Sequence, residues 1–435
     1  METLKIERIR GIKGEFTPPP DKSVTHRALI LAAMADGLSL IHNPLISFDT
    51  ETTMDVLRAL GVAVLCEGDR LLKVLSGGYK TFKSSENLPL YCANSGTTAR
   101  LIMGMLAPRG MYAVLDGDDS LRGRPMQRVI TPLSKMGADL QSAGNICGGS
   151  MPVYIKPASM FPAGVKGDVP SAQVKSAVLL AGTQLDGITS YTERLKTRDH
   201  TEALMPLFGA DININDLTVS VSGGYPLTAA ALTVPGDISS AAFIIAAALI
   251  FDNSEITVRS VGINPTRSAF LEIIRKWGAD ISIDNMKSGA EPTADITVRS
   301  SFLTGGVIEK DLTQKAIDEL PLLGMLGMFT QNGVEIRNAE ELRFKECDRI
   351  AAIVNNLREL GADAQDSGNT FTVTPYNKKN IKSDAGLRSF GDHRISMINV
   401  LLAKRFGLNI LSGDINYINV SFPGFLEQLS GLEVT

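Results

Sequence analysis

The sequence predicts an α/β protein of two domains, each built from three β-α-β-α-β-β repeats around three buried helices. One pattern, a small polar residue followed by a long apolar helix and a short strand, occurs six times in the 435 residues. A regular repeat period indicates that each copy is one structural unit. A chain of this length also exceeds what one hydrophobic core normally serves, so two domains of three copies each are expected. The apolar helices begin 68 to 79 residues apart, near Ser23, Ser95, Ser171, Ser239, Asp318 and Asp392.

The first apolar helix is expected within residues 22–37, with Ser23 as its N-cap and Gly37 just past its end. Its body is apolar on all sides, which predicts a helix buried in the core. Its first turn nevertheless carries Lys22, His26 and Arg27. Free N–H groups, the positive end of the helix dipole and basic side chains together favour an anion site at this helix start.

Each apolar helix is followed by a strand, an amphipathic helix and two more strands. The strands after the apolar helices are expected at Leu38–Ile41, Tyr112–Leu115, Ile188–Tyr191, Ile256–Val258, Val334–Ile336 and Leu408–Leu411. The amphipathic helices, such as Thr53–Leu60, end in a glycine: Gly61, Gly137, Gly209, Gly278, Gly361 and Gly431. Period-2 strands such as Ala279–Ile283 and Asp295–Val298 close the copies. The C-terminus cuts the last copy short, and the N-terminal strand Leu4–Ile12 is expected to supply the missing piece.

The domain boundaries follow from this count. Residues 21–234 hold the first three copies, and residues 1–20 together with 235–435 hold the last three and the N-terminal strand. The chain is therefore expected to cross between the domains twice, near Pro20 and near Pro235. If threefold pseudosymmetry relates the buried helices of a domain, they run parallel and their N-termini share one face. We expect the active site in a cleft between two such faces, where helix N-termini attract anions.

Arginine recurs at the starts of these helices, although the helix dipole disfavours cations there. Arg27, Arg124, Arg349 and Arg394 all stand at such positions. Sequences tolerate this kind of local conflict mainly at functional sites. The recurrence predicts a substrate with several negative charges, such as phosphates and carboxylates.

Composition excludes several other classes of protein. The formal net charge of −4 argues against nucleic acid as the main partner. The longest apolar run, Ala241–Phe251, is too short to span a membrane, and we expect neither a secretory signal nor a transit peptide before Leu4. The four cysteines and four histidines are scattered, which fits reduced thiols in the cytoplasm and predicts no metal site.

Five motifs in this order resemble those of the 5-enolpyruvylshikimate-3-phosphate synthases, a branch of the enolpyruvyl transferases, and the resemblance runs the whole length of the chain. The motifs are Pro20-Asp21-Lys22-Ser23-x-x-x-Arg27, Asn94-Ser95-Gly96-Thr97-Thr98-x-Arg100, Arg122-x-Arg124-Pro125, Lys345-Glu346-x-Asp348-Arg349 and Gly391-Asp392-His393-Arg394. The resemblance implies two inverse α/β-prism-like domains, which agrees with the repeats.

The resemblance also implies a reaction. The enolpyruvyl group of phosphoenolpyruvate would move to the 5-hydroxyl of shikimate 3-phosphate, with release of phosphate, by addition and elimination through a tetrahedral intermediate. This step belongs to chorismate and aromatic amino acid biosynthesis. It implies a cytoplasmic enzyme, expected to be a monomer, with two small-molecule substrates and no cofactor.

The resemblance assigns roles to residues of these motifs and to Ser171, Gln173 and Asp318. Lys22 would contact both substrates, and Ser23, Arg27, Ser171 and Gln173 would hold shikimate 3-phosphate. Phosphoenolpyruvate would be bound by Gly96, Arg124, Arg349 and Arg394. Lys345 and Asp318 would lie at the shikimate hydroxyls, with Asp318 as the general base. Glu346 would protonate the methylene carbon and later remove a proton from it. The catalytic set is thus Asp318, Glu346 and Lys22.

Other functions of related folds are less favoured. Enolpyruvyl transfer to UDP-N-acetylglucosamine is the nearest alternative, but that branch carries a cysteine in a mobile loop, and the corresponding segment 116–124 has none. RNA 3′-phosphate cyclisation is disfavoured by the acidic net charge. A non-catalytic anion-binding scaffold gains nothing from Asp318 and Glu346.

Three positions depart from the pattern of some family members. Val420 replaces a lysine that contacts phosphoenolpyruvate, and Ala172 replaces a second serine at the phosphate. Thr197–His200 replaces Ser-Lys-Pro-Tyr, and Arg198 in that segment could add a phosphate contact or lie at the surface.

Overall fold

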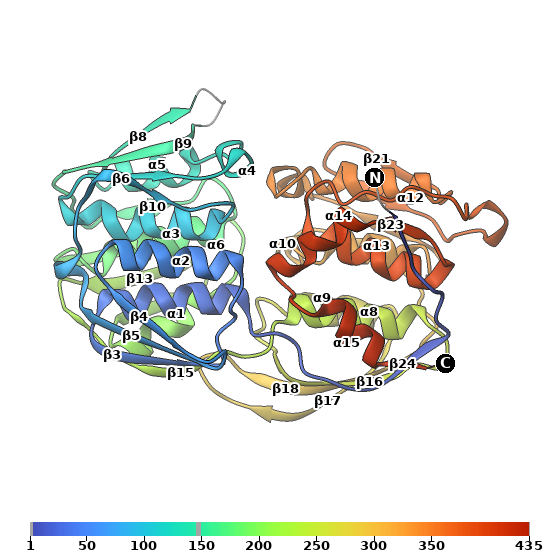
Figure 1. Cartoon of the computed structure of the whole chain (residues 1–435). Helices are drawn as coiled ribbons and strands as arrows, with labels where there is room; N and C mark the ends of the chain where they lie inside the picture. The colour runs from blue at the N-terminus through green and yellow to red at the C-terminus, as the bar shows by residue number, and fades with distance from the viewer. Residues whose placement is uncertain (1–2, 145–148, 435) are drawn as a thin grey trace. The chain divides into compact units, whose positions relative to one another are not determined.

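The chain crosses twice between two units, which are described separately. A computed structural model describes residues 3–144 and 149–434 (Figure 1). Residues 20–235 form the inserted unit, and residues 1–19 with 236–435 form the terminal unit. Backbone hydrogen bonds close each unit at the crossings. In the inserted unit Asp21 N donates to Pro235 O (2.8 Å), and in the terminal unit Asp237 N donates to Pro19 O (2.8 Å).

The inserted unit holds three repeats, each with one buried helix and one sheet. The first repeat comprises α1 (Lys22–Met34), β3 (Ala35–His42), α2 (Phe48–Ala59), β4 (Ala63–Glu67), β5 (Leu71–Gly77), β14 (Leu227–Thr228) and β15 (Ala231–Thr233). The second comprises β6 (Ser85–Tyr91), α3 (Gly96–Leu106), β7 (Ala113–Asp116), α4 (Asp119–Arg122), α5 (Gln127–Ser134), β8 (Asp139–Gly144) and β9 (Ser150–Lys156). The third comprises β10 (Gly164–Lys166), α6 (Ala172–Gly182), β11 (Gly187–Thr192), α7 (His200–Leu204), β12 (Asp211–Asn215) and β13 (Thr218–Gly223).

The terminal unit repeats this plan with less regularity. Its first repeat comprises β2 (Gly11–Phe16), α8 (Ile238–Ile250), β16 (Glu255–Gly262), α9 (Ala269–Lys276), β17 (Asp280–Lys287) and β18 (Thr293–Arg299). The next comprises β19 (Gly306–Ile308), α10 (Asp311–Lys315), α11 (Leu320–Gly327), β20 (Val334–Ile336), α12 (Arg349–Glu359), β21 (Ala364–Asp366) and β22 (Phe371–Val373). The last comprises β1 (Thr3–Lys5), α13 (His393–Phe406), β23 (Asn409–Leu411), α14 (Ser412–Ile415), α15 (Phe425–Gly431) and β24 (Glu433–Val434).

The sheets share one strand order. In the inserted unit the orders are β14-β3-β5-β4, β6-β7-β9-β8 and β10-β11-β13-β12, and the terminal unit repeats the order in β19-β20-β22-β21. The strand that enters a buried helix lies parallel to the strand that leaves it, and the two later strands add antiparallel. Parallel neighbours need a crossover connection of this kind, because a short hairpin turn cannot join them. The predicted mixed α/β repeat fold is confirmed.

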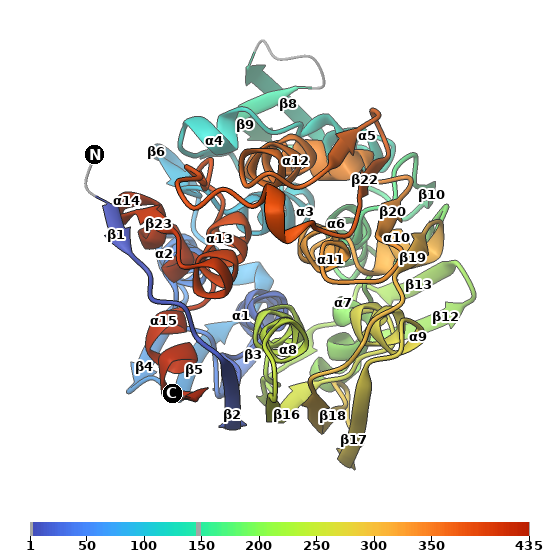
Figure 2. The same ribbon diagram turned by 90° about the vertical axis from the view of Figure 1, so that its right-hand side faces the viewer.

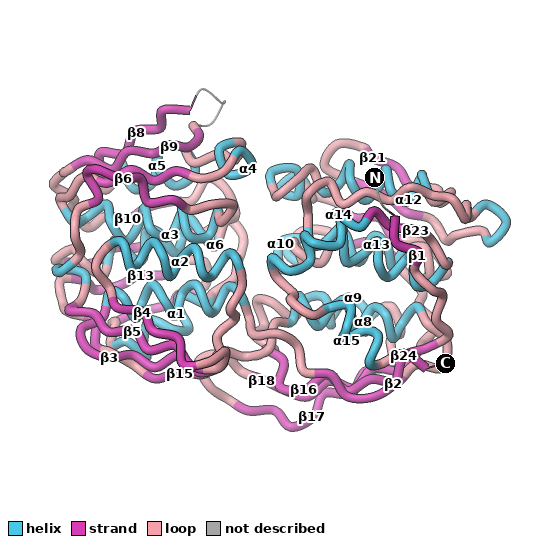
Figure 3. The backbone as a smooth tube through the Cα atoms, in the orientation of Figure 1, coloured by secondary structure: helices cyan, strands magenta, loops and turns pink. Residues whose placement is uncertain are grey.

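The buried helices lie inside each unit because their sequences leave no polar face. Every residue of α8 is buried, and α1 is buried from Val24 to Met34. Figure 2 shows α8, α11 and α13 nearly end on, with strands outside them, and Figure 3 shows the same layering of helices and strands in the inserted unit. Helices α3 and α6 approach closely at Gly104, where an added Cβ would lie 2.2 Å from the carbonyl oxygen of Ala177.

Three helix starts differ from the expected ones. Ser23 is not the N-cap of α1, because the carboxylate of Asp21 accepts from Val24 N (2.9 Å) and the helix begins at Lys22. Asp237 likewise caps α8 in place of Ser239. Helix α11 begins after Glu319, with Pro321 in its first turn. The N-caps Ser95, Ser171 and Asp392 are confirmed, whereas Gly37 lies inside β3.

The N-terminal segment is two strands and not the single strand expected at Leu4–Ile12. Strand β1 pairs antiparallel with β23 in the last repeat, as expected. Strand β2 instead pairs parallel with β16 and antiparallel with β24. It therefore supplies the first strand of the fourth repeat, a role that the first repeat fills with β14 and β15 from the end of the inserted unit.

Candidate active site

The helix N-termini of the inserted unit converge on one face. Arg27 in α1 donates through Nη2 to the Ser176 hydroxyl in α6 (3.2 Å). Arg100 in α3 donates to the side-chain oxygen of Gln173 in α6 (2.5 Å), and Gln173 donates back to Thr97 Oγ1 (2.9 Å). Side chains from the first two turns of α1, α3 and α6 thus meet one another. The expected shared face is present in this unit.

Lys22 and Ser23 lie half-buried at the start of α1. The Lys22 ammonium forms an ion pair with Asp49 Oδ2 at 2.9 Å, and both side chains are largely shielded from solvent. Asp49 comes from the first turn of α2. This pair fixes the direction of the lysine side chain, because a partly shielded charge is held more firmly than an exposed one.

Gly96 opens α3 beside two guanidinium groups. A Cβ at Gly96 would lie 3.3 Å from Nη1 of both Arg100 and Arg124. Arg124 is 7% exposed and donates to Asn94 Oδ1 and to Ser120 Oγ. The glycine therefore leaves two cations against the first turn of a helix whose N–H groups also attract anions.

Ser171 caps α6 by accepting from Val174 N, and Gln173 follows in the first turn. Arg100 holds Gln173 on one side and the Pro125 carbonyl on the other. Arg100 is 8% exposed, so this cation ties α3 to α6 from a buried position.

A hydrogen-bonded chain runs under this face. His26 Nδ1 lies 2.7 Å from Thr53 Oγ1, which lies 2.6 Å from Thr98 Oγ1, and Thr98 donates to Ser95 Oγ (2.7 Å). Since Thr98 donates onward, Thr53 donates to Thr98 and His26 donates from Nδ1. Burial lowers the pKa of His26 to about 3, so the imidazole is neutral.

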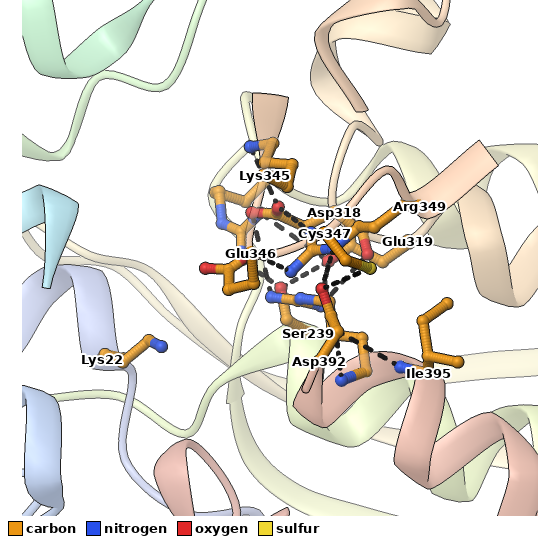
Figure 4. Close-up of polar contacts among 12 residues, drawn as sticks. Lys22, Ser239, Asp318, Glu319, Lys345, Glu346, Cys347, Arg349, Asp392 and Ile395 are labelled. Atoms are coloured by element: carbon orange, nitrogen blue, oxygen red, sulfur yellow. Dashed lines mark hydrogen bonds and ion pairs between the residues drawn. The ribbon is translucent and has the colours of Figure 1, made fainter. Parts of the chain in front are cut away.

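The terminal unit gathers its own charged cluster around Arg349, the first residue of α12 (Figure 4). The guanidinium donates through Nε to Asp392 (2.7 Å), through Nη1 to Asp318 (3.1 Å) and through Nη2 to Glu346 (2.6 Å). Arg349 is 1% exposed. One buried cation therefore orients three carboxylates, two of which are the candidate acid and base.

Lys345 and Arg394 complete this cluster on the Asp318 side. Lys345 Nζ lies 3.3 Å from Asp318 Oδ1. Arg394, in the first turn of α13, donates to the Asp318 carbonyl (3.2 Å) and lies 3.6 Å from the buried carboxylate of Glu319. Glu319 in turn accepts from Ser239 of α8. The starts of α8, α11, α12 and α13 therefore meet within this unit.

The electrostatics of the cluster favour permanent charge on Arg349. Burial by itself disfavours the charged guanidinium, but the carboxylates of Asp392, Glu346 and Asp318 outweigh it and raise the pKa of Arg349. Burial, reinforced by Asp392, raises the pKa of the Cys347 thiol. Cys347 is thus a protonated neighbour of the cluster and no nucleophile at neutral pH.

The sequence-predicted residues fall into two groups. Lys22, Ser23, Arg27, Gly96, Arg124, Ser171 and Gln173 share the face of the inserted unit, and Asp318, Lys345, Glu346, Arg349 and Arg394 share the cluster of the terminal unit. Arg198 and Val420 are half-buried, and their contributions stay open. Across residues 3–144 and 149–434 no group of three or more potential ligands could hold a metal ion. None of the helices described is long and apolar enough to span a membrane.

Sequence reasoning missed the partners of the predicted residues. Asp49, Ser176, Thr201 and Glu319 each contact a predicted site residue or its neighbour. The sequence indicated Asp49 only weakly: it is an acidic residue near the start of α2, and Lys22 needs an anion nearby. Nothing local marked Thr201, which lies 174 residues from Arg27 in the sequence.

The similarity to known proteins extends over nearly the whole chain. A family model described as EPSP synthase (3-phosphoshikimate 1-carboxyvinyltransferase) matches residues 6–429. The chain is 38% identical over 432 residues to the 3-phosphoshikimate 1-carboxyvinyltransferase of Endomicrobium trichonymphae, covering 99% of both proteins. It is also 38% identical to the enzyme of that name from Bacillus subtilis, again with 99% of both covered. A solved structure of EPSP synthase from Acinetobacter baumannii is similar with a TM-score of 0.85 and 34% identity, over 100% of this chain and 98% of that one.

Proposed function

The chain belongs to the EPSP synthase family, and from this membership we propose how its residues perform the family reaction. The enzyme transfers the enolpyruvyl group of phosphoenolpyruvate to the 5-hydroxyl of shikimate 3-phosphate and releases phosphate. The observation that supports this function best is the cluster around Arg349. It combines two carboxylates for proton transfer with three cations for anionic substrates, Lys345, Arg349 and Arg394.

We assign the proton transfers at the attacking hydroxyl and at the methylene carbon to different carboxylates. Asp318 takes the proton of the attacking hydroxyl, and Lys345 beside it steadies that hydroxyl. Glu346 delivers a proton to the methylene carbon in the addition and removes one in the elimination. Its Oε2 accepts from Arg349 (2.6 Å), which orients the carboxyl group.

The cations supply electrostatic stabilisation for the departing phosphate. Lys22, Arg124, Arg349 and Arg394 are already fixed by Asp49, Asn94, Asp392 and the Asp318 carbonyl. Groups that are oriented in advance lose little in reorganisation when charge develops on the substrate. The proposed shikimate 3-phosphate contacts are Lys22, Ser23, Arg27, Ser171 and Gln173, and Gly96 gives phosphoenolpyruvate access to the start of α3.

The assigned residues belong to both units, so both must reach the same pair of substrates during the reaction. We further propose that the enzyme acts on these small molecules as a cytoplasmic monomer. Among the described residues no helix is long and apolar enough to span a membrane, which is consistent with that location. Gel filtration with light scattering tests the monomer.

A phosphate-release assay with phosphoenolpyruvate tests the reaction. Shikimate 3-phosphate should support release, and UDP-N-acetylglucosamine, the acceptor of the alternative enolpyruvyl transferase, should not. Release with the sugar nucleotide alone would refute the assignment. Glu346→Gln is the matched control, because it keeps the shape of the side chain and should abolish release with the correct acceptor.

A further inference from the structure

Arg27 is oriented by two hydroxyl groups that the reaction itself does not require. Its Nε donates to Thr201 Oγ1 (2.8 Å) and its Nη2 to Ser176 Oγ (3.2 Å), while Nη1 donates to the Ser23 carbonyl (3.1 Å). Arg27 is 4% exposed, and Thr201 and Ser176 are each 1% exposed. The guanidinium therefore has little freedom to turn, because each of its nitrogens has an acceptor in a buried setting.

The directions of the hydrogen bonds among Arg27, Thr201 and Ser176 can be assigned. A guanidinium only donates, so Thr201 Oγ1 accepts from Arg27. The hydroxyls of Thr201 and Ser176 lie 2.6 Å apart, and Ser176 donates to the Ala172 carbonyl (2.7 Å). Since the Ser176 proton is used there, Thr201 donates to Ser176. The chain thus runs from Arg27 through two hydroxyls to the carbonyl of the first residue of α6.

Helix α7, which carries Thr201, is fastened to α6 by buried charge. Lys175 of α6 contacts the carboxylates of Glu193 (2.9 Å) and Glu202 (2.5 Å), and all three side chains are almost fully buried. Glu202 follows Thr201 in the sequence. A buried ion pair resists separation because either partner left alone would be an uncompensated charge. The position of the Thr201 hydroxyl against Arg27 is therefore set by the packing of α6 and α7.

We propose that Thr201 and Ser176 are positioning residues that aim Arg27 at shikimate 3-phosphate. They touch neither substrate, and they act by fixing the Nε and Nη2 edge of the guanidinium. This inference rests on the proposed function, because it takes Arg27 as a shikimate 3-phosphate contact. It predicts that loss of either hydroxyl weakens the binding of shikimate 3-phosphate and leaves that of phosphoenolpyruvate nearly unchanged.

Thr201→Val tests the proposal. Valine has a similar size and cannot accept a hydrogen bond, so the buried Nε of Arg27 loses its acceptor. Losing a hydrogen bond to a charged group corresponds to about a tenfold weaker Kd for shikimate 3-phosphate, measured by calorimetry. The KM for shikimate 3-phosphate should rise similarly, with kcat and the KM for phosphoenolpyruvate within about twofold of wild type. Thr201→Ser keeps the hydroxyl and should bind like the wild type.

Two further measurements separate positioning from general damage to the fold. The Arg27 Nε–H signal in nitrogen-edited NMR, assigned with Arg27→Lys, should be protected in the wild type and Thr201→Ser and lost in Thr201→Val. Ser176→Ala leaves Thr201 in place and should also weaken shikimate 3-phosphate binding. It supplies the test if Thr201→Val fails to fold.

Several outcomes would overturn the inference. Wild-type affinity in both Thr201→Val and Ser176→Ala would do so, as would an equal rise in the KM of both substrates. If Arg27→Ala loses shikimate 3-phosphate binding while these variants keep it, only the positioning role fails. If the wild type does not bind shikimate 3-phosphate, the proposed function itself fails.

Discussion

At the scale of single residues, the cations of both units are held before any substrate arrives. Arg349 is the extreme case, since its guanidinium faces Asp318, Glu346 and Asp392. An anionic substrate that enters this cluster must compete with carboxylates for the same donors. The competition favours a ligand that matches the fixed directions of the donors over one that merely carries charge.

Variants of Arg124 and Arg100 should distinguish a residue proposed to bind substrate from one that only supports the neighbouring side chains. Arg124→Ala should lose about 2–5 kcal/mol of transition-state stabilisation in kcat/KM, as expected when a buried charge contact is cut on one side. Arg100 ties Gln173 to the Pro125 carbonyl, so Arg100→Ala should cost less. Arg122, whose side chain is 49% exposed beside Asp116, is the surface control and should change little. Equal losses for Arg124→Ala and Arg100→Ala would contradict the assigned roles.

The two candidate carboxylates should give different defects. Glu346→Gln should stop exchange of the methylene hydrogens of phosphoenolpyruvate with deuterated solvent, followed by NMR, and should leave the binding of both substrates nearly intact. Asp318→Asn should impair attack by the hydroxyl and strengthen shikimate 3-phosphate binding, because it removes a negative charge beside an anionic ligand. Exchange at the wild-type rate in Glu346→Gln would show that another group is the acid.

His26 should make stability depend on pH. Its pKa is lowered to about 3 by burial, whereas the unfolded chain binds a proton near pH 6.5. Between these values the unfolded state holds the extra proton, so stability falls as pH falls, by about 1.4 kcal/mol per pH unit from this residue. Urea unfolding of wild type and His26→Gln at pH 7 and pH 5 measures the difference. Identical pH slopes for the two proteins would exclude this role for His26.

At the scale of helices and strands, the sequence patterns predicted that an element is present better than they predicted the residues at which it begins and ends. The strand at Val334–Ile336 and the caps Ser95, Ser171 and Asp392 are confirmed. The expected cap Ser23 is wrong because a carboxylate two residues earlier reaches Val24 N. A serine and an aspartate so close together are both good caps, and local sequence does not decide between them.

Site residues could be predicted from the sequence only where the residue type is unusual for its position in an element. Arginines at helix starts stood out because they oppose the dipole, and Arg349 and Arg394 are indeed in first turns. Thr201 and Glu319 act through contacts with distant segments. Periodic patterns in the sequence carry no information about contacts between distant segments, so these contacts can be seen only in the folded chain.

Gly104 should be needed for the contact between α3 and α6. An added Cβ would lie 2.2 Å from the carbonyl oxygen of Ala177, so Gly104→Ala forces the helices apart. We expect a loss of about 1–3 kcal/mol in unfolding free energy, as for other overpacked cores. Gly431→Ala is the control, since this glycine is also helical and has open space around it. Its unfolding free energy should not fall, and an equal loss in both variants would contradict the packing argument.

At the scale of the whole molecule, the proposed substrate contacts from both units should change how the units are arranged. A ligand that touches both favours states in which both reach it, by its differential affinity for those states. Saturating shikimate 3-phosphate should therefore lower the radius of gyration in small-angle scattering. Arg27→Ala should abolish the change by weakening binding. A radius that stays the same with bound ligand would contradict the expectation.

The pairing of β1 with β23 and of β2 with β16 has a consequence for synthesis on the ribosome. The first strands to emerge are among the last to find their partners, since β16 begins at residue 255 and β23 at residue 409. The inserted unit has all its strands once residue 235 is made. Because domains fold as units during translation, the nascent chain completes its middle first and carries β1 unpaired until β23 has been made.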